Sequence, residues 1–596
     1  MDGGDRHRLG TITGVAALGL DALASCAYGP EAVVVALAVA GAAGLGAAPL
    51  VTAVIVGLLA LLVLGYRQVI AAYPDGGGAY SVARRNLGPG AGLVAAASLV
   101  VDYVLNVAVS IAAGVAALTS AFPDLIGWTP ALCLGALAVV TAVNLRGVVT
   151  GGRLFALPAA VFVGALAVVI VVGLLRDGPA ETLPPAAPVV GAQEVGVLLL
   201  LAAFANGCAA LTGVEAIANA TPSFRADRRR RARDAELVLG VVLGLLLLGL
   251  GALVDRLGVA PTPDRTLLSL LVQASLGSGW IYVGVQLTTV VLLALAANTS
   301  YGGLPVLAAR LAADDALPRM FAVRGDRQVY RASILSLSVL AAVLLLVTGG
   351  DVALLVPLFA IGVFVGFALC QAGMVVHHLR TGGPGARARV ALCGTASALT
   401  AVAAVVLTVE KAAAGAWLVV VVVPMLVALF VAVRRGYAGM AARLAADRCT
   451  ALPHGAPSVV VVPVAEIDVL AEHALSTARS MGRDTVAVHV VLGRDADDLA
   501  AADDLRRRWA RWRPDVELVL LSGTDERGRP RRRLGPAVCG YLRALAAGGR
   551  DVTLLIPEPA PRRRRHAPLL GHRGAGLARY AARHTDAVVG RMRLRA

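Results

Sequence analysis

Three carboxylic acids of this sequence lie inside long apolar stretches, where an ionisable side chain is costly. Asp21 stands in DALASCAYGPEA, Asp102 in DYVLNVAVS and Glu215 in GCAALTGVEAIANA. Ionisable residues within apolar spans face a cavity or a partner, and they mark ion paths or proton relays. The three acids therefore predict a polar chamber inside an otherwise apolar protein.

Oxygen-bearing side chains accompany Asp102 at helical spacing. Asn106 and Ser110 follow it at intervals of four residues, so the three side chains share one face of a helix. Tyr103 lies beside that face. This stretch is expected to form one wall of the chamber.

The other two acids stand beside breaks in their helices. Gly29–Pro30 follows Asp21 and Tyr28, and proline removes a backbone donor, disfavours helix at the preceding residue and frees carbonyl oxygens. Thr212 and Glu215 share a helical face in a glycine-weakened segment. Carboxylates, hydroxyls and free carbonyls together make a negative, oxygen-rich pocket that favours a hard cation, and crowded carboxylates give a route to proton coupling.

The elements that hold these residues are those of a membrane protein. Of the 596 residues, 58% are hydrophobic and 15% charged, with a mean hydropathy of +0.77. Soluble domains carry roughly 25% charged residues, so the composition argues against a soluble enzyme, and no enzymatic activity is expected. About twelve stretches reach the length of a membrane-spanning helix, at residues 11–43, 47–72, 90–121, 130–146, 153–175, 192–222, 234–257, 278–309, 331–347, 352–379, 389–409 and 415–433.

The basic residues predict the orientation. The formal net charge is +16, and arginines gather in alternate connections, as they do in cytoplasmic loops. Both termini are therefore predicted to be cytoplasmic, in a protein of the plasma (inner) membrane. We expect these arginines to contact lipid headgroups and not nucleic acid. The seven cysteines lie mostly in apolar runs without metal-ligand spacing, so reduced thiols and no resident cofactor are expected.

The composition changes after the last apolar stretch. We place a transmembrane domain at 1–436, a linker at 437–456 and a cytosolic domain at 457–596. In the last part, β-rich runs at 459–462, 485–492, 516–521 and 552–556 alternate with helical segments, which is typical of an α/β domain with a mainly parallel sheet. No glycine-rich phosphate fingerprint follows the first of these strands.

The two helix breaks occupy matching places. Each comes soon after the start of a set of five helices, the first set ending near Leu175 and the second running from about Ala192 to His378. Paired interruptions in two halves favour an inverted-repeat transporter with its site at the bilayer midplane. The sequence thus predicts a polytopic α-helical transporter built from a 5+5 inverted repeat.

The motifs carrying the acids, together with YPDGGGAYSVARRNLG, LAANTSYGGLP, IGVFVGFALCQAGM and GAWLVVVVVP, resemble those of APC-superfamily KimA-type potassium transporters. That family is similar to the KUP potassium uptake proteins and to amino-acid permeases. The resemblance implies a LeuT-like fold and proton-coupled potassium import by alternating access. It also implies that the cytosolic domain resembles universal stress proteins, mediates homodimerisation and holds a regulatory cyclic di-AMP site.

The resemblance assigns roles to individual positions. Its ion-site positions fall on Asp21, Tyr28, Asp102, Tyr103, Ser110, Thr212 and Glu215. Potassium is expected at five of them, Asp21, Tyr28, Asp102, Ser110 and Thr212, and Glu215 is the candidate for proton coupling. Two positions depart from the family pattern. Asn106 replaces a threonine and still offers an oxygen, whereas Phe359 replaces a tyrosine and offers none.

Two other functions fit parts of the sequence. One is a proton-coupled amino-acid or polyamine permease of the same fold. The segment Ser25–Tyr28 lacks the glycine pair that holds a substrate carboxylate in typical amino-acid permeases, and Asp21 and Asp102 would repel an anion, although they would attract an organic cation. The other is a signalling receptor whose tail senses a nucleotide, which leaves the intramembrane acids unexplained.

Overall fold

The chain divides into two compact units, Met1–Arg443 and Leu444–Ala596. The computed structural model describes residues 9–76, 78–147, 152–184, 195–262, 264–322, 329–443, 457–481, 484–491, 496–512, 515–523, 534–560 and 573–595. The last helix of the first unit continues to Arg443, past the predicted domain end at residue 436, and residues 444–456 of the predicted linker lie outside the described residues.

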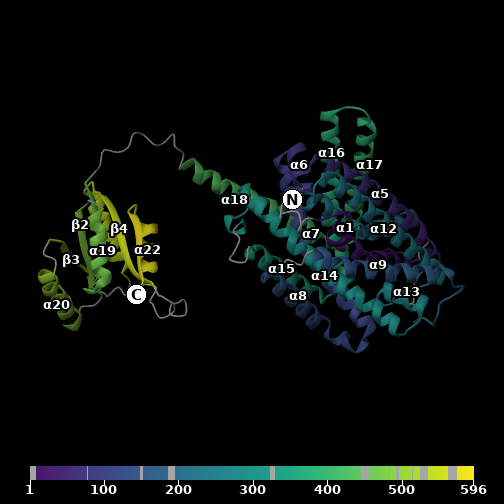
Figure 1. Ribbon diagram of the computed structural model, residues 1–596, viewed down its shortest axis with the longest axis horizontal. Helices are drawn as coiled ribbons and strands as arrows, with labels where there is room; N and C mark the ends of the chain where they lie inside the picture. Colours follow the sequence, from purple (N-terminus) through teal and green to yellow (C-terminus); the bar gives the residue numbers. More distant parts are fainter. Residues whose placement is uncertain are drawn as a thin grey trace. The chain divides into compact units, whose positions relative to one another are not determined.

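The first unit is α-helical (Figure 1). Its α-helices are α1 (Thr11–Leu18), α2 (Leu20–Ala24), α3 (Gly29–Ala38), α4 (Gly41–Leu45), α5 (Ala48–Ala72), α6 (Gly78–Asn86), α7 (Pro89–Ala121), α8 (Thr129–Leu145), α9 (Gly152–Leu175), α10 (Val197–Gly207), α11 (Ala216–Asn219), α12 (Arg228–Leu257), α13 (Leu267–Leu276), α14 (Trp280–Ala313), α15 (Arg331–Thr348), α16 (Val352–Thr381), α17 (Ala386–Glu410) and α18 (Trp417–Arg443). Short 3₁₀ turns are η2 (Ser25–Ala27), η3 (Pro123–Trp128), η4 (Cys208–Leu211), η5 (Thr221–Ser223) and η6 (Arg319–Ala322), and η7 (Ala412–Ala416) is a π-helical turn.

Twelve helical segments of the described residues are long and apolar enough to cross a membrane. This confirms the predicted number of spans, and we call the first unit the membrane unit. Its third span, α7, packs against α14 and α16, and most of its side chains are buried. The polar face that starts at Asp102 is therefore enclosed by neighbouring helices and not by lipid.

Small residues bring α12 close to α5. A Cβ atom at Gly240 would lie 2.6 Å from Val63, and one at Gly251 would lie 2.8 Å from Thr52. The residue numbers rise along one helix as they fall along the other, so the two helices run antiparallel. Close approach through small residues is the usual basis of helix packing in membranes. The hydrophobic effect does not drive helices together there, because lipid tails are as apolar as the side chains.

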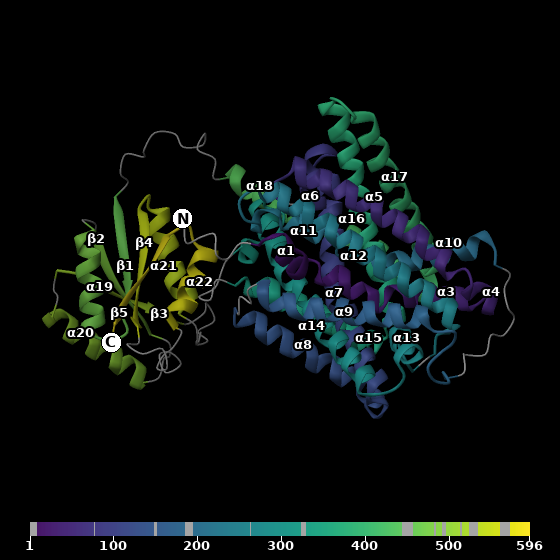
Figure 2. The same cartoon turned by 45° about the vertical axis from the view of Figure 1, so that its right-hand side comes forward.

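The second unit is the predicted α/β domain (Figure 2). Its strands are β1 (Ser458–Pro463), β2 (Asp484–Val491), β3 (Glu517–Ser522), β4 (Asp551–Ala560) and β5 (Val588–Arg595), and its helices are α19 (Val469–Ser480), α20 (Ala496–Trp512), α21 (Gly535–Ala547) and α22 (Arg573–His584). All neighbouring strands are parallel, in the order β3-β2-β1-β4-β5. Helices α19 and α20 cover one face of the sheet, and α21 and α22 cover the other.

Candidate functional site

The two interrupted helices of the membrane unit are packed against each other at their breaks. Helix α2 gives way to η2 before α3 begins, and α10 gives way to η4, after which Thr212 is extended and Gly213 is left-handed. Ser25 donates through Oγ to the carbonyl oxygen of Ala210 (2.6 Å), and the Tyr28 hydroxyl lies 3.2 Å from Thr212 Oγ1. Both breaks that the sequence suggested in the first and sixth spans are therefore present and in contact.

Gly213 allows the second break to approach Asp21. Its φ is +81°, a conformation that residues with a side chain rarely adopt. A Cβ atom at this position would lie 2.7 Å from the backbone nitrogen of Ala22 and 2.9 Å from Cβ of Asp21. Both the backbone conformation and the close contact require glycine here.

All three predicted acids are buried, with Asp21 7% exposed, Asp102 5% and Glu215 6%. Each lies within electrostatic range of the other two. Asp21 Oδ1 and Glu215 Oε2 have no hydrogen-bond partner among the described residues. Within that part of the chain, no three His, Cys, Asp or Glu side chains converge closely enough to hold one metal ion. The acids thus set a shared negative field, and a cation held here would take oxygens from other groups as well.

A cavity of about 580 Å³ reaches two of these acids, and we call it the acidic cavity. Asp21, Tyr103 and Glu215 line it, whereas Asp102 is not among its lining residues. Further polar lining residues are Tyr80, Asn144, Asn219, Ser223, Asn298, Thr299, Tyr301 and Arg310. The cavity can admit water and ions to the second break.

Tyr28 lines a different cavity, also of about 580 Å³, which we call the Tyr28 cavity. Glu31 of α3 lies beside it there, and its carboxylate accepts a hydrogen bond from the backbone nitrogen of Leu267 (3.1 Å). On another wall, Asn206 donates to Glu410 (3.0 Å). Tyr28 therefore lines one cavity, whereas Asp21, Tyr103 and Glu215 line the other.

The third-span face is joined to α14 by hydrogen bonds. Ser110 donates to Oδ1 of Asn106 (3.1 Å), and the Asn106 amide donates to Oγ of Ser300 (3.0 Å). Asn106 is thus a bridge between two helices as well as an oxygen donor. Sequence reasoning did not single out Ser300, although it lies within the motif LAANTSYGGLP and is a polar residue in an apolar span.

Phe359 is fully buried in α16, which packs against both α7 and η4. Its side chain offers no oxygen, so the departure from the family pattern places an apolar ring on the helix that faces the second break and the third span. The prediction that this position belongs to the ion site stays a prediction.

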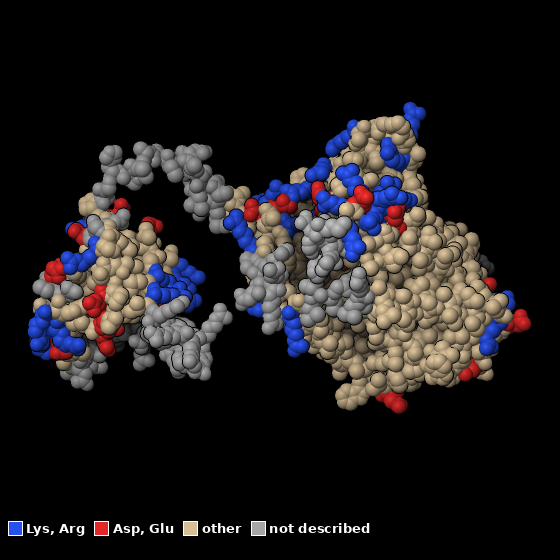
Figure 3. Space-filling model, viewed as in Figure 1, with Lys and Arg blue, Asp and Glu red and all other residues tan. Residues whose placement is uncertain are grey.

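Arginine-rich connections meet on one side of the membrane unit, which we call the arginine face. Arg228 is paired with Asp75 (3.9 Å), and Arg310 donates to the Asp75 carbonyl oxygen (3.3 Å). Arg319 lies 5.0 Å over the ring of Tyr437. In Figure 3, most blue atoms of the membrane unit follow one rim, beside a broad tan belt. This separation of charge is typical of a protein embedded in a bilayer.

A polar latch joins α6 to the end of α14. The Tyr80 hydroxyl donates to Oδ2 of Asp314 (2.5 Å), and Arg84 forms an ion pair with the same carboxylate. The hydrogen bond from Arg84 lowers the pKa of Asp314, while burial and then the hydrogen bond to Asp314 raise the pKa of Tyr80 to about 12. Since Tyr80 also lines the acidic cavity, the latch borders access to that cavity.

A fourth buried acid was missed by sequence reasoning. Glu236 is 0% exposed, and neither of its carboxylate oxygens has a hydrogen-bond partner among the described residues. The residue lies near the start of the predicted span 234–257, directly after the arginine run, and was not singled out as an intramembrane acid. The helical period was the available signal, because Glu236 shares a face with the apolar residues of α12 that follow it.

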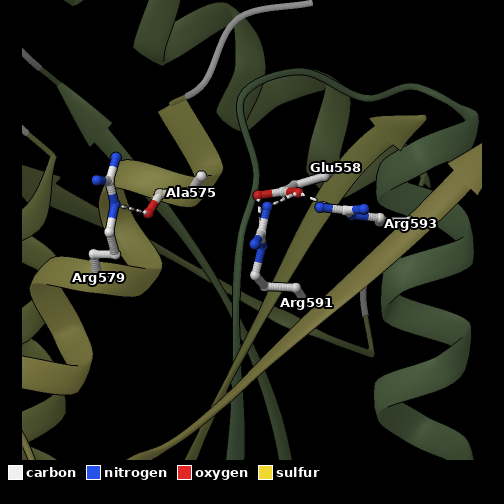
Figure 4. A network of polar contacts seen from close by, with 5 residues as sticks. All are labelled: Glu558, Ala575, Arg579, Arg591 and Arg593. Atoms are coloured by element: carbon white, nitrogen blue, oxygen red, sulfur yellow. Dashed lines mark hydrogen bonds and ion pairs between the residues drawn. The ribbon is translucent and has the colours of Figure 1, made fainter. Parts of the chain in front are cut away.

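In the second unit, a charged network lies near the carboxyl ends of β4 and β5 (Figure 4). Glu558 accepts hydrogen bonds from Arg591 at 3.0 and 2.5 Å and is paired with Arg593 (3.6 Å). Its carboxylate also lies against Gly574 in the first turn of α22, where helix dipoles favour negative charge. This end of the sheet therefore combines cationic side chains with a helix N-terminus.

Known proteins resemble both units. The model of the amino acid permease family matches residues 18–432, and that of the KimA potassium transporter C-terminal domain matches residues 456–594. The chain is 37% identical to the potassium transporter KimA of Bacillus subtilis (strain 168) over 523 residues, which cover 86% of this chain and 84% of the relative. A crystal structure of the Eremococcus coleocola manganese transporter, in complex with an aromatic bis-isothiourea substituted compound, aligns with a TM-score of 0.42 at 12% identity and covers 71% of this chain and 93% of that one.

Proposed function

The chain belongs to the amino acid permease family and, within it, to the KimA potassium transporters, and from this premise we propose that it imports potassium across the plasma membrane. One observation carries the proposal: two unwound helix segments pack together beside three buried acids. Potassium needs neutral oxygens to replace its hydration shell and nearby negative charge to offset desolvation. Tyr28, Thr212 and Ser110 can supply the oxygens, and Asp21 and Asp102 the charge.

Import is proposed to be driven by proton symport through Glu215. This carboxylate lines the acidic cavity and keeps one oxygen without a partner among the described residues, so it can exchange a proton with water in the cavity. The variant Glu215→Gln is expected to bind rubidium, a potassium substitute, while losing the dependence of uptake on the proton gradient. If a protonophore still abolishes uptake by this variant, as it does in the parent, the assignment of Glu215 is wrong.

The proposed mechanism is alternating access in a LeuT-like 5+5 inverted repeat. The breaks in the first and sixth spans are five spans apart, as an inverted repeat requires. Asp21 and Glu215 line the acidic cavity, Tyr28 lines the Tyr28 cavity, and the Tyr28 hydroxyl is hydrogen-bonded to Thr212 at the second break. An ion could then pass if the two cavities open in turn around the breaks.

We propose that the arginine face is cytoplasmic and that both ends of the chain lie on that side. The support is the clustering of basic residues on one side of twelve spans, since cytoplasmic loops hold the excess of Lys and Arg. Cysteine labelling of intact cells, with one cysteine near each terminus, would test the orientation. Labelling by a membrane-impermeant reagent would contradict it.

For the second unit, we propose a domain that resembles universal stress proteins, mediates homodimerisation and binds cyclic di-AMP as a regulator. Its strand order switches direction between β1 and β4, and doubly wound sheets bind ligands at such points, beyond the carboxyl ends of the strands. The full-length protein should therefore bind cyclic di-AMP in calorimetry and sediment as a dimer. A monomer without nucleotide binding would refute this part alone.

The second candidate function is transport of an amino acid or polyamine. The observation in its favour is the acidic cavity, whose volume of about 580 Å³ is large enough for an organic cation. Counterflow in proteoliposomes separates the two functions: labelled rubidium should exchange against internal potassium, whereas labelled amino acids and polyamines should not. The same assay on protein lacking the second unit tests the receptor hypothesis, which predicts no transport at all.

A further inference from the structure

Glu236 lies on the face of α12 that packs against α5. The register of the two antiparallel helices is fixed by the contacts of Gly240 with Val63 and of Gly251 with Thr52. Four residues before Gly240 in α12 is Glu236, and four residues after Val63 in α5 is Arg67. Side chains four apart share a helix face, so the register places Glu236 opposite Arg67.

Glu236 is buried and Arg67 is half-buried, and neither side chain is fully hydrogen-bonded within the described residues. Glu236 is 0% exposed, and both its oxygens and the Nε atom of Arg67 lack hydrogen-bond partners among the described residues. An ionised carboxylate at membrane depth without a partner is costly, and such groups serve as proton relays. A residue needed only for packing would be better served by leucine or methionine at this position.

Glu236 also lies within electrostatic range of the proposed ion site. The charged side chains that act on it are Glu215, at the second break, and Arg67. Tyr66, the neighbour of Arg67 in α5, is 0% exposed and lies within electrostatic range of both Glu215 and Glu236.

The position of Glu236 along α12 points toward the arginine face. The helix begins at Arg228, whose guanidinium is paired with Asp75 on that face. Eight residues separate Glu236 from Arg228, which corresponds to about 12 Å along the helix axis at about 1.5 Å per residue. The acid is therefore a short step from the face at which a transported proton would leave.

We propose that Glu236 is a second proton-binding residue, which receives the co-transported proton from Glu215 and releases it at the arginine face. The inference rests on the proposed proton symport. Glu215 gives up its proton as Glu236 gains one, through the Tyr66 hydroxyl or a water. Glu236 then gives its proton to water and becomes an anion opposite the Arg67 guanidinium, which balances its charge. No other reactant is needed.

The test uses the full-length protein in proteoliposomes with an inward proton gradient and labelled rubidium. Glu236→Gln should lose uphill rubidium accumulation, so that the internal concentration no longer exceeds the external one. It should retain rubidium counterflow at equal pH, because the ion site is intact. Asp234→Asn is the matched control in the same helix: its half-exposed carboxylate pairs with Arg230 (4.0 Å), so proton-driven accumulation should stay at the parental level.

A structural charge pair would behave differently. If Glu236 only balanced Arg67, the double variant Arg67→Gln with Glu236→Gln would regain proton-driven accumulation, and the proposal would be overturned. Proton-driven accumulation by Glu236→Gln alone would also overturn it. Should the glutamine variant fail to fold, Glu236→Asp must shift the pH profile of uptake, and an unchanged profile would count against the inference. A parent protein without proton-driven uptake would instead refute the proposed symport itself.

Discussion

Replacing Gly213 by alanine tests whether the two breaks must stay packed together for ion binding. The new Cβ atom would lie 2.7 Å from the backbone nitrogen of Ala22 and 2.9 Å from Cβ and Cγ of Asp21, closer than carbon atoms approach without a shift. The left-handed backbone at φ +81° is strained by the same Cβ atom. Both effects disfavour the arrangement in which Asp21 and Thr212 lie near the same ion.

The size of the effect follows from these two terms. An L-residue in the left-handed region costs roughly 1–2 kcal/mol, and overpacking a tight contact costs about 1–3 kcal/mol. Together they disfavour the packed breaks by at least about 2 kcal/mol, and each 1.4 kcal/mol corresponds to about tenfold in affinity. Gly213→Ala should therefore weaken rubidium binding about thirtyfold or more.

The assay is equilibrium binding of labelled rubidium to the purified protein, alongside thermal unfolding. Gly302→Ala is the matched control: Gly302 also lines the acidic cavity, but a Cβ atom there would meet no other atom within 4 Å. That variant should bind like the parent and gain slightly in stability, because alanine favours helix more than glycine does. Parental affinity in Gly213→Ala would show that ion binding does not require the packed breaks, and the reasoning would fail.

Three further predictions concern the ion site and the latch. Asp102→Asn should abolish potassium-dependent growth of an uptake-deficient host at micromolar potassium, because the buried negative field loses a charge; normal growth would remove Asp102 from the site. Phe359→Tyr should tighten rubidium binding by adding a ligand oxygen, whereas unchanged binding would show that this ring does not reach the ion. Arg84→Gln should speed labelling of Asn219→Cys in the acidic cavity, because the latch to Asp314 is broken. Arg84 lowers the pKa of Asp314, so the ion pair persists above the ordinary carboxyl pKa and is lost only as the pH falls through the lowered pKa. In the Asn219→Cys parent, the latch itself should therefore not respond to pH between about pH 5 and 8. A labelling rate that rises on mild acidification, after correction for the reactivity of the thiol, would contradict this pairing.

Local chemistry explains what the sequence could predict. The twelve spans follow from hydropathy alone, and the breaks follow from proline and glycine beside intramembrane acids, both of which act within a few residues. The strands β1 to β4 contain apolar runs that can be recognised in the sequence, whereas β5 alternates arginine with apolar residues and resembles an exposed segment.

Long-range pairing explains what the sequence could not predict. The latch joins Arg84 to Asp314 across 230 positions of the sequence. The pairing of Glu236 with Arg67 can be recognised only from the register of α12 against α5. Charge is ambiguous in a linear sequence, because an acid after an arginine run looks solvated unless its helical phase is compared with the apolar face. Intramembrane acids next to loops therefore need this comparison before they are assigned to the surface.

In the proposed site, the carboxylates supply the negative charge and neutral oxygens supply most of the ligands, and this division determines how the site can select one cation over another. No three carboxylates of the described residues converge on one point, so other oxygens must complete the shell of a bound ion, and the field of the acids does not distinguish one monovalent cation from another. Discrimination then depends on the number and field strength of the neutral oxygens that replace water around the ion. It follows that Asp102→Asn should weaken sodium and rubidium binding alike, whereas Phe359→Tyr, which changes the oxygen count, should change their ratio. The reverse pattern would mean that a carboxylate, and not a hydroxyl, makes the selective contact.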